Sequence, residues 1–199
     1  LDVAALVAFA IDRGCDTAVV VSPNNPTARS VPRDDLLRAA RELEAHGCRL
    51  IVDESFVEFA PEGLDGSVEP FLEAHPNLSV LKSMSKVMGI AGLRIGYLRS
   101  GDREFVDALR AQLPIWNLNG LAEAFLRAVG RYRREFRESC DLTRAASLDL
   151  FERLQALPGL RPVAPAANFV LCQLQADSAD ARAFARLLYI EHNILLKDC

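Results

Sequence analysis

Lys86 and its neighbours form the part of the sequence in which residue type and spacing most clearly predict chemistry. The lysine lies in the run LKSMSKVMGIAGLRIGYL, after Ser83 and Ser85 and before a glycine-punctuated apolar stretch that reaches Arg94. A lysine among small hydroxyl residues and glycines can hold an aldehyde cofactor as a Schiff base. Two hydroxyls and a planar guanidinium are groups that bind a phosphate dianion. The run therefore predicts a covalent cofactor site with a phosphate-binding end.

Two polar residues upstream extend this prediction. Asp53 ends the apolar run CRLIVDES, where a carboxylate is costly unless it has a partner. A pyridinium nitrogen is such a partner, because the carboxylate keeps the nitrogen protonated and the ring can then accept electrons from a substrate's α-carbon. Asn25, in the turn Pro-Asn-Asn-Pro-Thr, could donate its amide to a phenolate oxygen. With Lys86, these residues point to pyridoxal phosphate.

Each of these residues also has a simpler explanation when it is taken alone. Lys86 is then a solvated loop lysine, Arg94 a surface ion-pair partner and the two serines turn caps. Asp53 is a helix N-cap or a salt-bridge partner, and Asn25 stabilises its own turn. Only the placement of Asn25, Asp53 and Ser83–Lys86 together at the carboxyl ends of predicted strands favours a shared site.

The first half of the chain alternates strand and helix signals. The β-branched run TAVVVS, residues 17–22, predicts a strand buried on both faces, and residues 33–45 predict a helix that ends at Gly47. CRLIVDES, LSVLKS and RIGYLRS predict three further strands. Strands separated by crossovers form a mostly parallel sheet, in which ligands bind beyond the carboxyl ends of the strands. The predicted fold class is therefore α/β.

The second half is predicted to be mostly helical. Helices are expected over 102–113, over 120–157 with an interruption at Gly130, and from Ala179 to His192. NFVLCQL and the final ILLKDC predict short strands. We therefore expect two domains. Residues 1–138 form a large cofactor-binding domain without its N-terminal part, and residues 139–199 form part of a small C-terminal α+β domain.

Composition narrows the class of protein. The 199 residues are 50% hydrophobic, enough to bury a core in one or two domains. The net charge of −4 is mild and no basic patch is present, so nucleic acid is not an expected partner. No apolar run is long enough to cross a bilayer, so no membrane partner is expected.

Cysteine and histidine usage gives no metal site. The five cysteines are scattered, odd in number and without CxxC spacing, so neither a disulfide framework nor a zinc site is expected. This usage is typical of a reducing compartment, and we expect a cytoplasmic location. The three histidines have no partner spacing that suggests a metal or a catalytic triad.

Three ordered blocks of the chain resemble a known family. VVVSPNNPT, RLIVDESFVEF and the Lys86 run are similar to the signature blocks of class I/II, fold-type I pyridoxal-phosphate aminotransferases. The nearest branch is that of histidinol-phosphate aminotransferase and threonine-phosphate decarboxylase. The resemblance implies that Lys86 is the Schiff-base lysine and the proton shuttle, and that Asp53 is the partner of the ring nitrogen. It also implies that Asn25 binds the phenolate oxygen.

The same resemblance implies phosphate ligands and a reaction. Ser83 and Arg94 would bind the phosphate, with Ser85 as a weaker candidate. The implied activity is transfer of an amino group between an amino acid and a 2-keto acid. The amino acids considered include phosphorylated ones. The family implies a homodimer when full length. Two alternatives stay open: an amino-acid decarboxylase of the threonine-phosphate type, and a non-catalytic ligand-sensing domain. Transamination is favoured because it is the commoner activity in the family.

Two residues depart from the usual aminotransferase pattern. Phe56 stands where a tyrosine usually donates to the phenolate oxygen, and Trp116 stands where a tyrosine is more frequent. Both resemble the decarboxylase branch, although each is also compatible with a simple aromatic wall beside the cofactor. The family's chains are much longer than this one. We therefore expect a fragment that binds the cofactor poorly and does not turn over in isolation.

Overall fold

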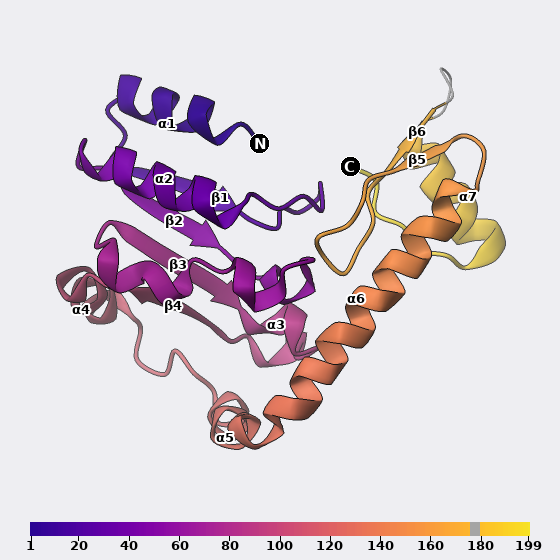
Figure 1. Cartoon of the computed structure of the whole chain (residues 1–199). Helices are drawn as coiled ribbons and strands as arrows, with labels where there is room; N and C mark the ends of the chain where they lie inside the picture. The colour runs from indigo at the N-terminus through magenta and orange to yellow at the C-terminus, as the bar shows by residue number, and fades with distance from the viewer. Residues whose placement is uncertain (176–179) are drawn as a thin grey trace.

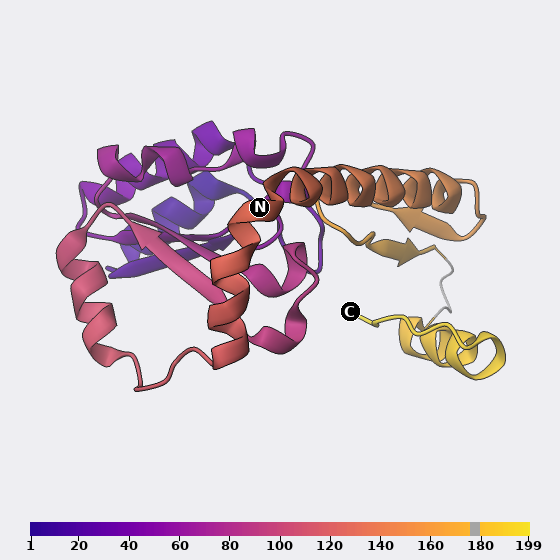
Figure 2. The ribbon, with the colours of Figure 1, turned by 90° about the horizontal axis from the view of Figure 1, so that it is seen from below.

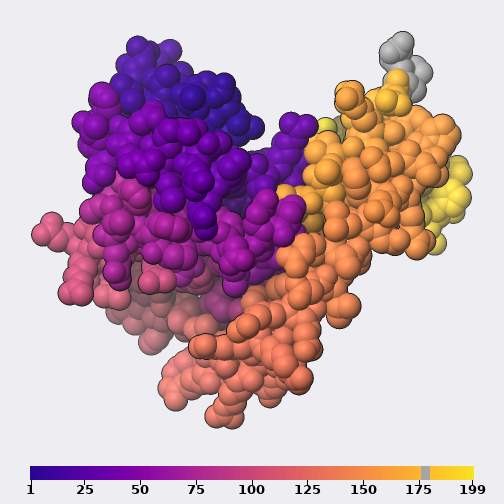
Figure 3. All heavy atoms as spheres, viewed as in Figure 1, coloured from indigo at the N-terminus to yellow at the C-terminus, as the bar shows by residue number. Residues whose placement is uncertain are grey.

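The computed structural model describes residues 1–175 and 180–199. Figure 1 shows a four-stranded sheet flanked by helices and, apart from it, a small two-stranded sheet. The long helix α6 (Arg133–Gln155) links the two, and Figure 2 shows it running from beside the large sheet to the small one. In Figure 3 the two parts touch along one side and are separated by an open notch along the other.

The large sheet has the order β1-β2-β3-β4. Its first three strands run parallel and β4 runs antiparallel to β3, so the expected mostly parallel α/β sheet is confirmed. Parallel strands need a crossover connection, usually a helix that runs back along the sheet. Between β3 and β4 lie only the single turns α3 (Met84–Val87) and η4 (Ala91–Leu93), so β4 reverses direction. The strands are β1 (Thr17–Val21), β2 (Arg49–Asp53), β3 (Leu78–Ser83) and β4 (Gly96–Ser100).

Two helices cover one face of this sheet. α1 (Val3–Asp12) and α2 (Arg33–Glu44) bury their apolar sides against the inward residues of β1, β2 and β3. The predicted helix over 33–45 is thus confirmed to within one residue, because its leucines and alanines recur at helical spacing. The buried residues of α2 are Leu36, Leu37, Ala39, Ala40 and Leu43.

The opposite face of the sheet is only partly covered. Val19 in β1 is 58% exposed and Leu81 in β3 is 40% exposed, whereas their neighbours Ala18 and Val20 are buried. The prediction that β1 is buried on both faces is therefore wrong. A continuous β-branched run shows that both faces of the strand can pack against an apolar layer. Whether such a layer is present depends on other parts of a protein.

Short helices and turns connect the strands, and side chains cap the two helices that follow β4. Asp102 accepts from the Phe105 N–H at the start of α4, and Asn119 accepts from the Ala122 N–H at the start of α5. The expected interruption at Gly130 is confirmed as a 3-10 turn, η5. The remaining elements of this part are η1 (Val57–Phe59), η2 (Gly63–Gly66), η3 (Glu69–Ala74), α4 (Arg103–Gln112), α5 (Gly120–Val129) and η5 (Gly130–Tyr132).

The C-terminal part is smaller than its sequence suggests. β5 (Leu160–Pro162) and β6 (Cys172–Leu174) form an antiparallel pair, so only the end of the predicted strand NFVLCQL is regular. α7 spans Ala181–His192, and its expected start at Ala179 lies outside the described residues. The predicted strand over 194–199 is wrong. Within the described residues this segment pairs with no strand, and a strand needs a partner for its backbone.

The proposed division between residues 138 and 139 falls inside α6. It stays a prediction, because one continuous helix leads from the large sheet to the small one. No helix within residues 1–175 and 180–199 is both long and apolar enough to span a membrane.

Candidate functional site

The polar residues predicted at strand ends meet at one edge of the large sheet. Val21 of β1, Asp53 of β2 and Leu81 of β3 lie side by side in the parallel register. The turn that contains Asn25 begins next to Asp53, because the Ser22 N–H donates to the Asp53 carbonyl at 2.9 Å. Ser83 ends β3 and precedes α3, which carries Lys86. The carboxyl ends of the three parallel strands thus converge as the sequence predicts.

A hollow of about 400 Å³ lies at this edge. Four of the predicted site residues line it, and they come from three places: the end of β2, the turn into α3 and the segment before β4. Gly96 also lines the hollow, and a side chain there would bring a Cβ within 2.9 Å of the Lys82 carbonyl oxygen. The polar lining residues are Asp53, Ser55, Lys82, Ser83, Ser85, Arg94 and Tyr97.

Lys86 lies on a second hollow, of about 410 Å³. Its side chain is exposed and follows Ser85 directly, but it does not line the hollow that contains Asp53. α5, α6 and the segment around Asn168 form the other walls. The structure therefore brings Lys86 next to the predicted phosphate-binding turn and does not place it in the same hollow as Asp53. The aromatic lining residues are Phe59, Phe125, Tyr132 and Phe136.

Asn25 and Phe56 have different surroundings. Asn25 is exposed and lines neither hollow, and it is the preceding Asn24 that accepts the Thr27 hydroxyl and holds the turn, at 2.9 Å. Phe56 is 6% exposed and packs edge to face against Phe169, with ring centroids 5.4 Å apart. Phe56 thus forms part of a buried aromatic cluster, and its role beside a cofactor stays a prediction.

Trp116 is the second residue that departs from the usual pattern, and it lies far out on the surface. It is 93% exposed, in the loop between α4 and α5, and its φ of 63° is in the left-handed region. It lines neither hollow.

The charged residues of the candidate site differ from those of the scaffold in their ion pairing. Within the described part of the chain, neither Asp53, Lys86 nor Arg94 takes part in an ion pair. The Arg94 guanidinium donates to the Ala91 carbonyl at 3.1 Å. Asp53 accepts from the Ser55 N–H at 2.9 Å. A carboxylate, an amine and a guanidinium are therefore all available at the edge where the strands end.

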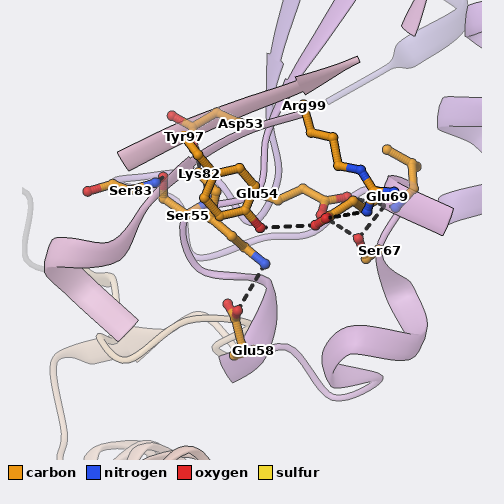
Figure 4. Close-up of polar contacts among 11 residues, drawn as sticks. Asp53, Glu54, Ser55, Glu58, Ser67, Glu69, Lys82, Ser83, Tyr97 and Arg99 are labelled. Carbon is orange, nitrogen blue, oxygen red and sulfur yellow. Dashed lines mark hydrogen bonds and ion pairs between the residues drawn. The ribbon is translucent and has the colours of Figure 1, made fainter. Parts of the chain in front are cut away.

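Lys82, the other lysine of the run, is bound within the scaffold. Its Nζ lies 2.9 Å from Glu58 Oε1, and both side chains are less than a tenth exposed. Figure 4 shows Lys82 pointing toward Glu58 and away from Ser83. Because an amine must be accessible to react with an aldehyde, this burial favours Lys86 over Lys82 as the reactive lysine.

A buried polar network below the hollow was not foreseen from the sequence. Glu54 accepts from the Ser67 hydroxyl at 2.5 Å and from the Val68 N–H at 2.7 Å, as Figure 4 shows for Ser67. Burial raises the pKa of the Glu54 carboxyl above its ordinary value. At the exposed edge of this network, Tyr97, which is 37% exposed, donates to Glu69 at 3.0 Å. The pKa of Tyr97 is also raised, by partial burial and by that carboxylate. A run of acids after an apolar strand was the only signal for this network.

The residues of the first hollow fit pyridoxal phosphate by the chemistry of their groups. Ser83, Ser85 and Arg94 offer two hydroxyls and a guanidinium for a phosphate dianion. Asp53 offers a carboxylate without a protein cation among the described residues, as a protonated ring nitrogen requires. No group of metal-binding side chains occurs within residues 1–175 and 180–199.

Comparison with known proteins identifies one matching family and several similar proteins. The model of the family described as "Aminotransferase class I and II" matches residues 2–199. CMP-5'-(3-aminopropyl)phosphonate synthase from Streptomyces rubellomurinus is 48% identical over 192 residues, which cover 96% of this chain and 30% of that protein.

Two solved structures share the arrangement described above. A decarboxylase from Sulfurospirillum multivorans has a TM-score of 0.87 and 28% identity, over 98% of this chain and 56% of its own. Histidinol-phosphate aminotransferase from Sinorhizobium meliloti, solved in complex with pyridoxal-5'-phosphate, has a TM-score of 0.83 and 26% identity, over 98% and 52%. This chain thus spans about half of these two structures and less of the synthase.

Proposed function

Because the chain belongs to the class I and II aminotransferase family, whose cofactor is pyridoxal phosphate, we propose that it forms the cofactor-binding part of an amino-acid decarboxylase. The proposed substrate is an amino acid that carries a phosphoryl or phosphonyl group. The family and the fold support chemistry at an amino acid's α-carbon, which decarboxylation and transamination share.

The relationship to the Streptomyces synthase carries the choice of decarboxylation. That relative is 48% identical, and its name describes an aminopropylphosphonate product. An aminopropyl group is a primary amine without an α-carboxylate, which is the kind of product that α-decarboxylation leaves. The similarity to the Sulfurospirillum decarboxylase supports the same choice. Phe56 is compatible with it, because it provides no phenol donor next to the site.

Each residue of the site would have its own role. Ser83, Ser85 and Arg94 would bind the phosphate, and Asp53 would hold a proton on the ring nitrogen. Lys86 Nζ would bind the aldehyde carbon. When bound, the cofactor supplies an electron-accepting ring conjugated to the substrate's α-carbon.

In the decarboxylation itself, the bond between the α-carbon and the carboxylate carbon breaks and carbon dioxide leaves. The electron pair of that bond stays on the substrate side. Lys86 Nζ, displaced from the aldehyde carbon by the substrate's amino group and protonated, would then deliver a proton to the α-carbon. Lys86 Nζ would finally bind the aldehyde carbon again, which breaks the bond of that carbon to the product's nitrogen and releases the amine. In transamination the Cα–H bond breaks instead, and Lys86 Nζ would take up that proton.

Product analysis with the natural full-length protein separates these reactions. Incubation with O-phosphoserine, O-phosphothreonine and a 2-amino-phosphonocarboxylic acid is expected to release carbon dioxide and an equal amount of the corresponding amine. A keto acid formed without carbon dioxide would establish transamination, the second candidate, which the family and the Sinorhizobium structure favour.

Lys86→Ala is the control, and it should release neither product. If the wild-type protein shows the visible band of the bound cofactor and turns over none of these amino acids in either way, a ligand-sensing role is favoured over both reactions.

A further inference from the structure

Ser55 connects two parts of the site that are distant in the sequence. Its N–H donates to Asp53 Oδ1 at 2.9 Å, and its hydroxyl oxygen accepts from the Ser83 N–H at 2.8 Å. The side chain is 6% exposed and lines the same hollow as Asp53 and Ser83. Figure 4 shows Ser55 beside Ser83. One residue thus contacts the partner proposed for the ring nitrogen and the turn proposed for the phosphate.

The hydroxyl of Ser55 replaces a missing strand contact. The paired register of β2 and β3 ends at Asp53 and Leu81, where the Glu54 N–H donates to the Leu81 carbonyl at 2.9 Å. Beyond that point the two strands separate, and the Ser83 N–H is bound by the Ser55 side chain. A partly buried backbone N–H needs an acceptor, so the position of Ser83 depends on this hydroxyl.

The two neighbours of Ser55 show that its orientation is specific. Glu54 points to the other side of the sheet and binds Ser67 and Val68 in the buried network. Phe56 enters the aromatic cluster and packs against Phe169. Of the three residues that follow Asp53, only Ser55 lines the hollow.

We propose that Ser55 is a positioning residue that holds the Asp53 carboxylate and the Ser83–Lys86 turn at a fixed separation, so that both can bind one cofactor. The proposal rests on the cofactor site described above and does not depend on which bond of the substrate breaks. Without the Ser55 hydroxyl, the Ser83 N–H has no other acceptor among the described residues, and the turn can move relative to Asp53. The ring nitrogen and the phosphate would then no longer be bound optimally at the same time.

The test compares Ser55→Ala with a matched serine in the natural full-length protein. Ser79 is also buried and lies on β3, but its hydroxyl has no hydrogen-bond partner in the described part of the chain. Ser55→Ala is expected to weaken pyridoxal-phosphate binding about tenfold, the effect of one lost hydrogen bond. It is also expected to shift the pH at which the visible band of the bound cofactor changes. Ser79→Ala should leave both unchanged.

Two further variants guard against a trivial loss of folding. Ser55→Thr keeps the hydroxyl and should restore affinity and the pH profile. Ser55→Cys keeps the volume with a weaker acceptor and should resemble Ser55→Ala. Melting curves of the cofactor-free variants show whether each one is folded.

The proposal is overturned if Ser55→Ala or Ser55→Cys is folded and binds the cofactor as the wild type does. It is also overturned if Ser79→Ala causes an equal loss. Failure of the decarboxylation proposal would be distinct from this outcome. It would appear as a normal visible band and normal cofactor affinity, with a keto acid or no product in place of carbon dioxide and an amine.

Discussion

Lys82 and Lys86 belong to the same short run, but they differ in burial and in ion pairing. Lys82 is buried and paired with Glu58, whereas Lys86 is exposed on a hollow of about 410 Å³. A paired and buried ammonium contributes to structure, and an accessible amine can form a covalent bond with an aldehyde. At the scale of single residues, accessibility therefore favours Lys86 over Lys82 as the reactive lysine.

We predict that Lys86→Ala abolishes covalent binding of pyridoxal phosphate, because no other accessible amine lies at this edge of the sheet among the described residues. Borohydride reduction followed by peptide mass analysis should find the cofactor on residue 86 in the wild type and nowhere in the variant. Lys197→Ala, in the C-terminal tail, is the control and should be labelled at residue 86 as usual. Labelling of Lys82 in the wild type would contradict the assignment.

The carboxyl of Glu54 should make stability depend on pH. Its pKa is raised in the folded state by burial, so the folded protein holds this proton more tightly than the unfolded chain does. The free energy of unfolding should therefore fall as the pH rises from the ordinary glutamate pKa of 4.5 through the raised pKa of Glu54.

In Glu54→Gln this contribution to the slope should disappear. Urea titrations at several pH values between about 4 and 8 measure the free energy of unfolding and its slope. The exposed Glu62→Gln is the control and should keep the wild-type slope. An unchanged slope in Glu54→Gln would show that Glu54 does not hold a proton in this window.

At the scale of elements, the Lys82–Glu58 pair ties β3 to η1. β3 carries the Ser83–Lys86 turn, and η1 ends at Phe59, which lines the hollow of Lys86. The Lys82–Glu58 pair therefore connects the elements that line the two hollows. Glu58 Oε2 has no hydrogen-bond partner among the described residues, so Lys82 is its main compensation.

We predict that Lys82→Met destabilises the fold by about 3–5 kcal/mol, because Glu58 is left buried without a cation. The double variant Lys82→Met/Glu58→Leu should recover most of this loss, since it removes both charges. Urea unfolding of the three proteins measures the effect. Arg153→Met, which breaks the exposed pair with Asp149, should cost less than about 1 kcal/mol. A loss in Lys82→Met no larger than this would refute the structural role of the pair.

At the scale of the whole molecule, the described residues cover the two faces of the large sheet unequally. α1 and α2 cover one face of the large sheet, while Val19 and Leu81 are exposed on the other. This chain covers 30% of the Streptomyces synthase and about half of the two solved relatives. The activity and the dimeric state of the whole protein are therefore expectations drawn from the family.

We predict that the polypeptide of residues 1–199 alone binds pyridoxal phosphate at least about tenfold more weakly than the natural full-length protein, since Asn25 and Lys86 are both exposed and further walls would be needed to enclose the cofactor. Equilibrium dialysis of both proteins measures the difference. Lys86→Ala in each background is the control for covalent attachment. Equal affinities would show that residues 1–199 contain the complete binding site.

The predictable part of the site depended on local patterns. Apolar runs that end in Asp53 and Ser83 predicted neighbouring strands, because parallel strands end at a shared edge. The direction of β4 and the absence of a strand over 194–199 were not predicted. The first depends on the length of the connection and the second on a pairing partner, and neither is encoded in the segment itself.

By itself, the sequence predicted the candidate residues for cofactor chemistry, because Lys86 and Asp53 are recognisable by type and by position after predicted strands, and Arg94 by type and spacing. Only the tertiary structure decided how they are held. The contact of Ser55 with Ser83, the pairing of Lys82 with Glu58 and the separate hollows of Lys86 and Asp53 all depend on distances between residues from different elements. Such distances arise when elements pack against one another, and the sequence of one element alone does not specify them.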